Sequence, residues 1–133
     1  MSPHYDLLYS EEYLRQLKTL SPEDQSIVRL FVLEILGGKG IGLASSHWLK
    51  PLGAGLWEFR IGRNLKGILK SEGIEFASSL ANRKILIRVF CSFEKDGILV
   101  LGCFNKLRSG GGRAQNLAIN KARTLLLTYR REK

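Results

Sequence analysis

The sequence predicts a single domain that mixes helices and strands, with two helices near the N-terminus, strands in the middle and one helix at the C-terminus. Apolar residues recur at helical spacing within residues 11–36 and 113–130, whereas apolar runs of strand length lie within 56–104. The 133 residues are enough for one hydrophobic core and too few for two ordinary domains. We therefore expect one domain over residues 1–133.

Start signals mark the two N-terminal helices. Ser10 can cap the first helix, and Ser21 followed by Pro22 is typical of the start of the second. The glycine-rich residues 37–40 are expected to end the second helix. The apolar and aromatic residues 4–9 before the first helix predict a short edge strand.

The middle of the chain holds one strand with a clear alternation. Residues 56–61 alternate between the two faces of a half-buried strand, so Glu58 and Arg60 share one face. Residues 40–55 show no such alternation and are expected to form a linker. Residues 62–84 are expected to be an insertion or a divergent hairpin.

A β-hairpin follows. The apolar runs 85–93 and 98–104 are typical of strands, and Asp96-Gly97 between them favours a two-residue loop. In the register that this loop sets, Cys91 and Cys103 lie on opposite faces of the hairpin. We therefore expect both to be reduced, buried thiols.

The last helix is predicted over residues 113–130, with an amphipathic pattern. Its apolar stripe is expected to contain Ala114, Leu117, Ala118, Ala122, Leu125 and Tyr129.

The charge is large and unevenly distributed. The formal net charge is +9, with three basic and six acidic residues in 1–36, ten and five in 37–99, and eight and one in 100–133. A basic C-terminal part is typical of nucleic-acid binding. A basic surface without a cognate ligand is the alternative.

Other features exclude several classes of protein. The longest apolar runs are far shorter than the roughly 20 residues that span a bilayer, and no signal peptide is apparent, so we expect a cytoplasmic protein. Besides the two cysteines the chain has only His4 and His47, so no metal-ligand spacing exists and no cofactor is expected. Packing or solvent exposure is the favoured interpretation of both histidines.

Arg88 interrupts an otherwise apolar strand. Because a buried unpaired cation is costly, we expect Arg88 to reach a cleft or to pair with an acid such as Glu58. Arg60 belongs to the same surface if the strand order brings it there. Such cations can stabilise the transition state of phosphoryl transfer, with structural ion pairs or plain binding as alternatives.

A second basic cluster lies between the last strand and the last helix. Lys106, Arg108 and Arg113 flank the segment Ser109 to Gly112, where glycines and a helix N-terminus can hold a phosphate. A linker with solvated charges is the alternative, and the segment matches no P-loop.

Four short segments occur in an order that resembles the RelE/HigB-like toxins, including their phage-derived branch. Residues 50–60 resemble the segment "K-x-L-x-x-G-L-x-E-L-R", and residues 87–90 resemble "Y-R-V-x-Y". Residues 101–106 resemble "L-x-x-F-x-K", and residues 118–123 resemble the closing helix. The resemblance covers most of the chain.

The resemblance implies an α+β fold in which two N-terminal helices pack on a mainly antiparallel sheet of about four strands, followed by a C-terminal helix. It also implies the toxin of a type II toxin-antitoxin system, a metal-independent mRNA endonuclease that is commonly ribosome-dependent and inhibits translation. The partners would be mRNA, the ribosome and a cognate antitoxin, for which a helix-turn-helix protein is one alternative. A catalytically inactive nucleic-acid-binding or regulatory module on the same fold is the competing hypothesis.

The resemblance also implies site residues. Arg88 matches a phosphate-stabilising position, Lys106 a position for charge stabilisation or proton transfer, and Arg60 a position for substrate positioning. The chain departs from the family at residues 62–84 and at 106–112, where the usual "K-K-T-x-x-T-P" continuation is replaced. Further RNA-binding residues are expected to be Lys50, Arg63, Arg108 and Arg113.

Overall fold

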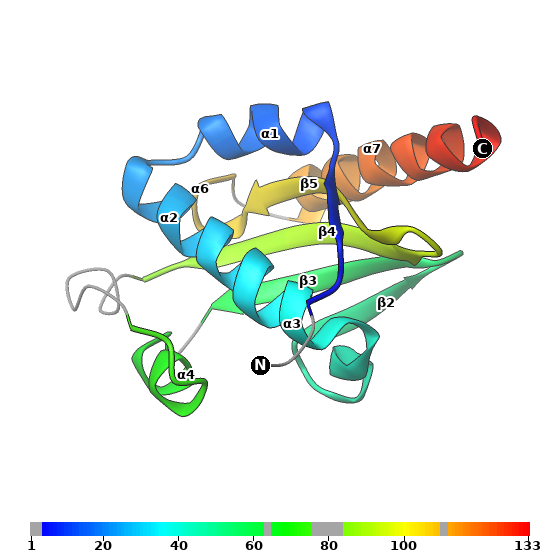
Figure 1. Cartoon of the computed structure of the whole chain (residues 1–133). Coiled ribbons are helices and arrows are strands. Elements are labelled where there is room, and N and C mark those ends of the chain that lie inside the picture. The colour runs from blue at the N-terminus through cyan, green and yellow to red at the C-terminus, as the bar shows by residue number, and fades with distance from the viewer. Residues whose placement is uncertain (1–3, 63–64, 76–83, 110–111) are drawn as a thin grey trace.

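The computed structural model describes residues 4–62, 65–75, 84–109 and 112–133. Within them the fold is α+β, as predicted: helices cover both faces of one mixed sheet of five strands (Figure 1). Helices α1 (Glu11–Lys18) and α2 (Pro22–Phe31) lie on one face, and α7 (Gly112–Arg131) lies on the other.

Ser10 and Ser21 cap α1 and α2, as predicted. The backbone N–H of Tyr13 donates to Ser10 Oγ at 3.0 Å, and that of Asp24 donates to Ser21 Oγ at 3.2 Å. After α2 the chain continues through the π-helical turn η1 (Val32–Leu36) and α3 (Gly37–Lys39). The α-helical conformation ends at Gly40, where φ is +54°, inside the predicted glycine-rich stop.

The sheet has one strand more than expected among the described residues. Its order is β1-β5-β4-β3-β2, and all neighbours are antiparallel except β1 and β5, which are parallel. The strands are β1 (Leu7–Tyr9), β2 (Leu49–Gly53), β3 (Leu56–Gly62), β4 (Leu86–Glu94) and β5 (Gly97–Asn105).

The additional strand is β2, which lies inside the predicted linker at residues 40–55. It is an edge strand that contains Pro51 and carries mostly exposed side chains, so its sequence lacks the apolar alternation of a half-buried strand. The 3-10 helix η2 (Gly40–Ser45) precedes it. The linker interpretation is therefore wrong.

The segment expected to be an insertion contains a helix. α4 (Leu65–Ser71) buries Leu65 and Leu69, which are four residues apart and share one helix face. This segment is therefore not a simple divergent hairpin. Residues 76–83 lie outside the described part of the chain.

Strands β4 and β5 form the predicted hairpin, but its turn lies one residue earlier than expected. Glu94 pairs with Gly97, so the loop is Lys95-Asp96 rather than Asp96-Gly97. Gly97 instead begins β5 with a φ of +144°. A Cβ at this position would collide with the carbonyl oxygen of Asp6, so the close approach of the chain before β1 explains the glycine.

A β-bulge in β5 overturns the predicted placement of the cysteines. Cys91 pairs with Val100, but the residue before Cys91 pairs with Gly102, which leaves Leu101 as an extra residue. Because the bulge changes the alternation of faces, Cys103 lies in the same core cluster as Cys91. Their placement on opposite faces was therefore wrong, although both cysteines are buried and free.

The sheet separates two hydrophobic clusters, and α7 covers the smaller one. Leu126, which is 2% exposed, and Ala122 pack against β4 and β5. Leu117 of the predicted stripe is 65% exposed, because the buried stripe runs through positions 118, 122 and 126. The prediction is therefore wrong for Leu117, whereas four other members of the predicted stripe pack in this cluster: Ala118, Ala122, Leu125 and Tyr129.

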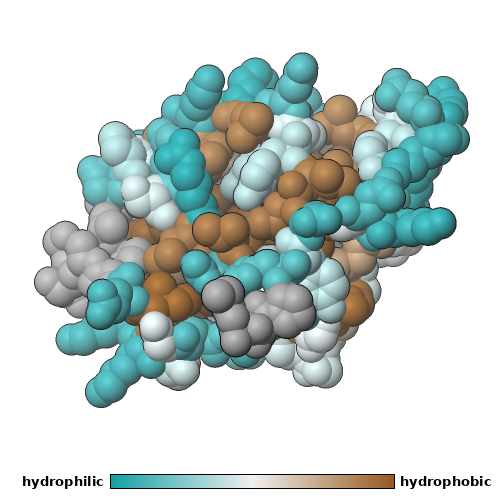
Figure 2. All heavy atoms as spheres, viewed as in Figure 1, coloured by the Kyte–Doolittle hydropathy of each residue, from teal (hydrophilic) through white to brown (hydrophobic). Residues whose placement is uncertain are grey.

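Basic residues of α7 form hydrogen bonds and an ion pair with residues at one end of the sheet. Arg123 donates to the carbonyl oxygens of Leu52 and Gly53 at the end of β2, at 2.9 and 3.0 Å. Arg130 donates to Ala54 O and forms an ion pair with Glu94. Figure 2 shows hydrophilic residues at the C-terminal end of this helix and a band of hydrophobic residues across the middle of the same view.

Among the described residues, none of the helices combines the length and apolar character needed to cross a membrane.

Candidate functional site

A cleft of about 740 Å³ opens where β3 and β4 meet the first residues of α6 (Lys106–Ser109). Side chains from β3, β4, α4, α6 and the turn before β2 line it. These lining residues are His47, Trp48, Arg60, Gly62, Ile68, Leu86, Arg88 and Lys106. The cleft therefore brings together the three residues predicted to be catalytic, from three separate segments of the chain.

The sheet register places two of these cations side by side. Arg60 of β3 pairs directly with Arg88 of β4. Like charges at directly opposed positions destabilise a sheet unless an opposite charge compensates them. Glu58, two residues before Arg60 and on the same face, provides that charge.

Glu58 is a buried carboxylate, 1% exposed, that contacts both arginines. Its Oε1 lies 3.1 Å from Arg60 Nε and 3.6 Å from Arg88 Nε. The predicted pairing of Arg88 with Glu58 is confirmed. A buried charge is costly without an opposite charge nearby. Glu58 and the two arginines therefore stabilise one another in this cluster.

Helix α7 supplies a further partner of Glu58. Gln115 Nε2 donates to Glu58 Oε2 at 2.9 Å, so both carboxylate oxygens accept hydrogen bonds. The sequence does not predict the contact of Gln115 with Glu58, because the two residues are 57 positions apart and the contact depends on how α7 packs on the sheet. It links the helix to the charged cluster.

The three cations differ in their access to a ligand. The Arg88 side chain is 10% exposed, and it also donates to the carbonyl oxygen of Ile87 at 3.4 Å. The Arg60 side chain is 37% exposed, and Lys106 is exposed at the start of α6. A bound anion would meet Lys106 and Arg60 first, with Arg88 deeper in the cleft.

The residues predicted to bind RNA have different locations. Lys50 is exposed on β2 and pairs with Glu58, so the two side chains share one sheet face. Arg113 is exposed in the first turn of α7. Arg63 lies outside the described residues, as do residues 110–111 of the predicted phosphate cradle.

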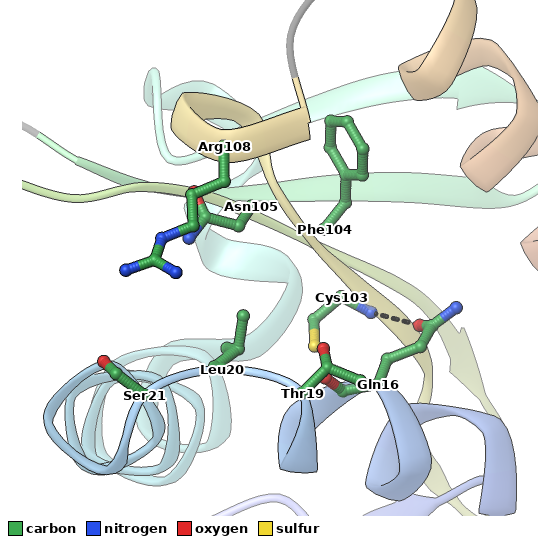
Figure 3. Close-up of a pocket in the computed structure, with 8 residues that line it drawn as sticks. All are labelled: Gln16, Thr19, Leu20, Ser21, Cys103, Phe104, Asn105 and Arg108. Carbon is green, nitrogen blue, oxygen red and sulfur yellow. Dashed lines mark hydrogen bonds between the residues drawn. The ribbon is translucent and has the colours of Figure 1, made fainter.

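Arg108 lines a different pocket, of about 290 Å³, between the α1–α2 junction and the end of β5 (Figure 3). Its side chain points from α6 toward Leu20 and Ser21. Gln16 Oε1 accepts the backbone N–H of Cys103 at 2.8 Å beside this pocket. The structure thus assigns Arg108 to another surface than Arg60, Arg88 and Lys106.

His47 is the cleft residue that the sequence interpretation set aside. Its exposed ring stacks on Trp48, with ring centroids 6.1 Å apart and planes 13° from parallel. The backbone N–H of Arg60 donates to Trp48 O at 2.8 Å, which holds this turn against β3. No local sequence signal identifies His47, because its position depends on this contact between separate segments.

Part of the C-terminal positive charge is used within the chain. Basic side chains of this region contact acidic groups or backbone carbonyls of other elements, as in the ion pair of Lys121 with Glu12 at 2.6 Å. The other residues of this kind are Arg123, Arg130 and Lys133. The count of eight basic residues in 100–133 therefore overstates how many cations without an internal partner this region offers to a ligand.

No protein-family model matches this sequence, and no curated protein matches it. In the described part of the chain, no three histidine, cysteine, aspartate or glutamate side chains are grouped so that they could hold a metal ion.

Proposed function

We propose that the protein is a cytoplasmic toxin of the RelE/HigB type that cleaves mRNA without a metal ion and so inhibits translation. The observation that carries the proposal is the convergence of Arg60, Arg88 and Lys106 on one cleft. These are the three positions that the resemblance assigns to the chemistry, and they are distant from one another in the sequence.

The proposed reaction is attack by a ribose 2′-hydroxyl on the adjacent phosphate. The 2′-oxygen loses its proton to solvent and bonds to phosphorus while the bond to the 5′-oxygen breaks. Protonation of the leaving 5′-oxygen then gives a 2′,3′-cyclic phosphate and a free 5′-hydroxyl. Negative charge grows on the phosphate oxygens in the transition state, where fixed cations are most effective. Arg88 stabilises that charge, Arg60 positions the phosphate, and Lys106 supplies charge or a proton to the leaving oxygen.

The proposed partners are mRNA on the ribosome and a cognate antitoxin. An acidic antitoxin segment would complement the basic residues around the cleft, including exposed Lys50 and Lys106. Occupation of the cleft by such a segment would exclude RNA.

The second candidate function is a nucleic-acid-binding or regulatory module without catalysis. It is favoured by Glu58, which already neutralises part of the charge of Arg60 and Arg88. Such a module would bind RNA through the exposed cations and leave it intact.

Inducible expression in bacteria separates the two functions, with growth and new mRNA 5′ ends as measurements. The toxin hypothesis predicts arrest and new ends, both lost in Arg88→Ala plus Lys106→Ala. Because Arg88 is buried, the single variant Lys106→Ala is needed as well, and it should reduce cleavage by about 100-fold or more. Lys95→Ala, an exposed lysine in the hairpin turn, is the matched control.

Each result bears on one hypothesis. Arrest that persists in the folded double variant would contradict the catalytic assignment. Normal growth with intact mRNA and soluble wild-type protein would favour the binding module.

A further inference from the structure

The cleft combines its cations with a column of stacked rings. Phe59 stacks on Trp48 with centroids 5.6 Å apart and planes 19° from parallel, and Trp48 stacks on His47. Phe31 packs against Trp48 at 5.9 Å from the α2 side. Phe31 and Phe59 are fully buried, so the column is anchored in the core and ends at an exposed ring.

His47 is the outermost member of this column and lines the cleft. Trp48, on which His47 stacks, is held in place. Its ring packs on two buried rings, and both its backbone N–H and its carbonyl oxygen form hydrogen bonds. The Trp48 N–H donates to Ser46 Oγ at 3.2 Å, and its carbonyl oxygen accepts from Arg60. Because His47 is exposed and lines the cleft, a ligand ring that stacks on it would extend this column.

The other residues that line the cleft indicate which chemical groups a ligand with such a ring would carry. Arg60 and Lys106 offer positive charge in the same cleft, while Ile68 and Leu86 offer apolar contact. A flat ring joined to an anion is the chemistry of a nucleotide. A base within a duplex is already stacked and paired, so only an unpaired nucleotide can use both parts of the cleft.

We propose that His47, backed by Trp48, is a base-stacking subsite for an unpaired ribonucleotide whose phosphate is bound by Arg60 and Lys106. The inference deepens the proposed function and rests on it, since it takes RNA as the ligand of this cleft. It assigns His47 to ring contact, because its plane continues the stack within 13°.

Binding of uncleavable probes to the full-length chain tests the subsite. The probes are a 2′-O-methyl hexaadenylate, a fully abasic 2′-O-methyl hexamer with the same phosphates, and a 2′-O-methyl hexamer of 2-aminopurine, whose fluorescence falls when the base stacks. None of them can react through a 2′-hydroxyl. Binding is therefore measured independently of cleavage.

The wild-type protein should bind hexaadenylate more tightly than the abasic probe and quench 2-aminopurine. In His47→Ala, the affinity for hexaadenylate should fall by about five- to 150-fold, while that for the abasic probe stays the same. His47→Phe should restore both affinity and quenching, since a phenyl ring stacks but cannot transfer a proton. His4→Ala is the matched control, because His4 is an exposed histidine outside the cleft lining.

Any of three results would contradict the subsite. The wild type could bind hexaadenylate and the abasic hexamer equally well, or His47→Ala could bind hexaadenylate as well as the wild type does. The third result is that His47→Phe fails to restore affinity and quenching. The failure of the proposed function has a different signature. If bacteria grow normally but the stacking pattern is present, the cleft binds unpaired RNA without cutting it, and this inference stands.

Discussion

Glu58 and Arg88 form a buried ion pair across β3 and β4, with Oε1 and Nε 3.6 Å apart. The pair joins the interior of the sheet to the cleft, because Arg88 lines the cleft while Glu58 is covered by Gln115 of α7. Glu58 is therefore both a structural counter-charge and a determinant of how the cleft cations are arranged.

Removal of this carboxylate should destabilise the protein strongly. Glu58→Ala removes the buried carboxylate that both Arg60 and Arg88 contact and leaves the two like charges directly opposed, so we expect a loss of about 3–5 kcal/mol in the free energy of unfolding. Glu12→Ala is the matched control, since Glu12 also has two basic partners but both of them, Arg15 and Lys121, are exposed, so that solvent screens the pairs and the expected loss is smaller. Urea unfolding of both variants measures the difference, and equal losses would contradict the role of burial.

Gly97→Ala should also be destabilising. The residue has a φ of +144° and a Cβ would collide with the Asp6 carbonyl oxygen, so we expect a loss of about 1–3 kcal/mol. Gly42→Ala is a suitable control because a Cβ there meets no neighbouring atom within 4 Å. Thermal unfolding followed by circular dichroism would show the loss, and a melting temperature equal to that of Gly42→Ala would argue against the strained start of β5.

The two cysteines should be unreactive in the folded state. Burial raises the pKa of both the Cys91 and Cys103 thiols to about 12, so little thiolate is present near neutral pH. We expect slow reaction with a thiol reagent such as Ellman's reagent at pH 8, with rapid reaction of both thiols in urea. Fast modification of the native protein would show that these thiols are accessible.

Acid should remove a stabilising contribution of Glu12. Hydrogen bonding to Arg15, followed by that to Lys121, lowers the pKa of this carboxyl to about 2 from an ordinary value of 4.5. A carboxyl whose pKa is lowered by folding stabilises the folded state above its unfolded pKa, and that contribution is lost as the pH falls from about 4.5 toward 2.

The comparison of wild type with Glu12→Gln measures this effect. The wild type should be the more stable protein at pH 7, and the difference should disappear as the pH approaches 2. A difference that is independent of pH over this interval would exclude ionisation of Glu12 as its cause. Titration of the carboxyl carbon by NMR gives the pKa directly.

Features that depend on neighbouring residues could be predicted from the sequence. The caps at Ser10 and Ser21 are local hydrogen bonds within three residues, so the chain before and after them is sufficient to identify both helices. The hairpin between β4 and β5 follows from two apolar runs and a short polar turn. The pairing of Arg88 with Glu58 was predictable because a buried cation in an apolar strand requires an acid.

Features that depend on contacts between distant segments could not be predicted from the sequence. The approach of β1 moves Gly97 out of the turn, and the bulge at Leu101 places both cysteines on one face. The edge strand β2 forms by pairing with β3 despite Pro51.

The site shows the same division. The available cations could be identified from the sequence, whereas the pairing of β3 with β4 places Arg60 and Arg88 side by side. Gln115 and His47 join the site because α7 and the turn before β2 pack against β3. The physical reason is that charge and local hydrogen bonding are properties of a short segment, whereas the packing of distant segments depends on the whole chain.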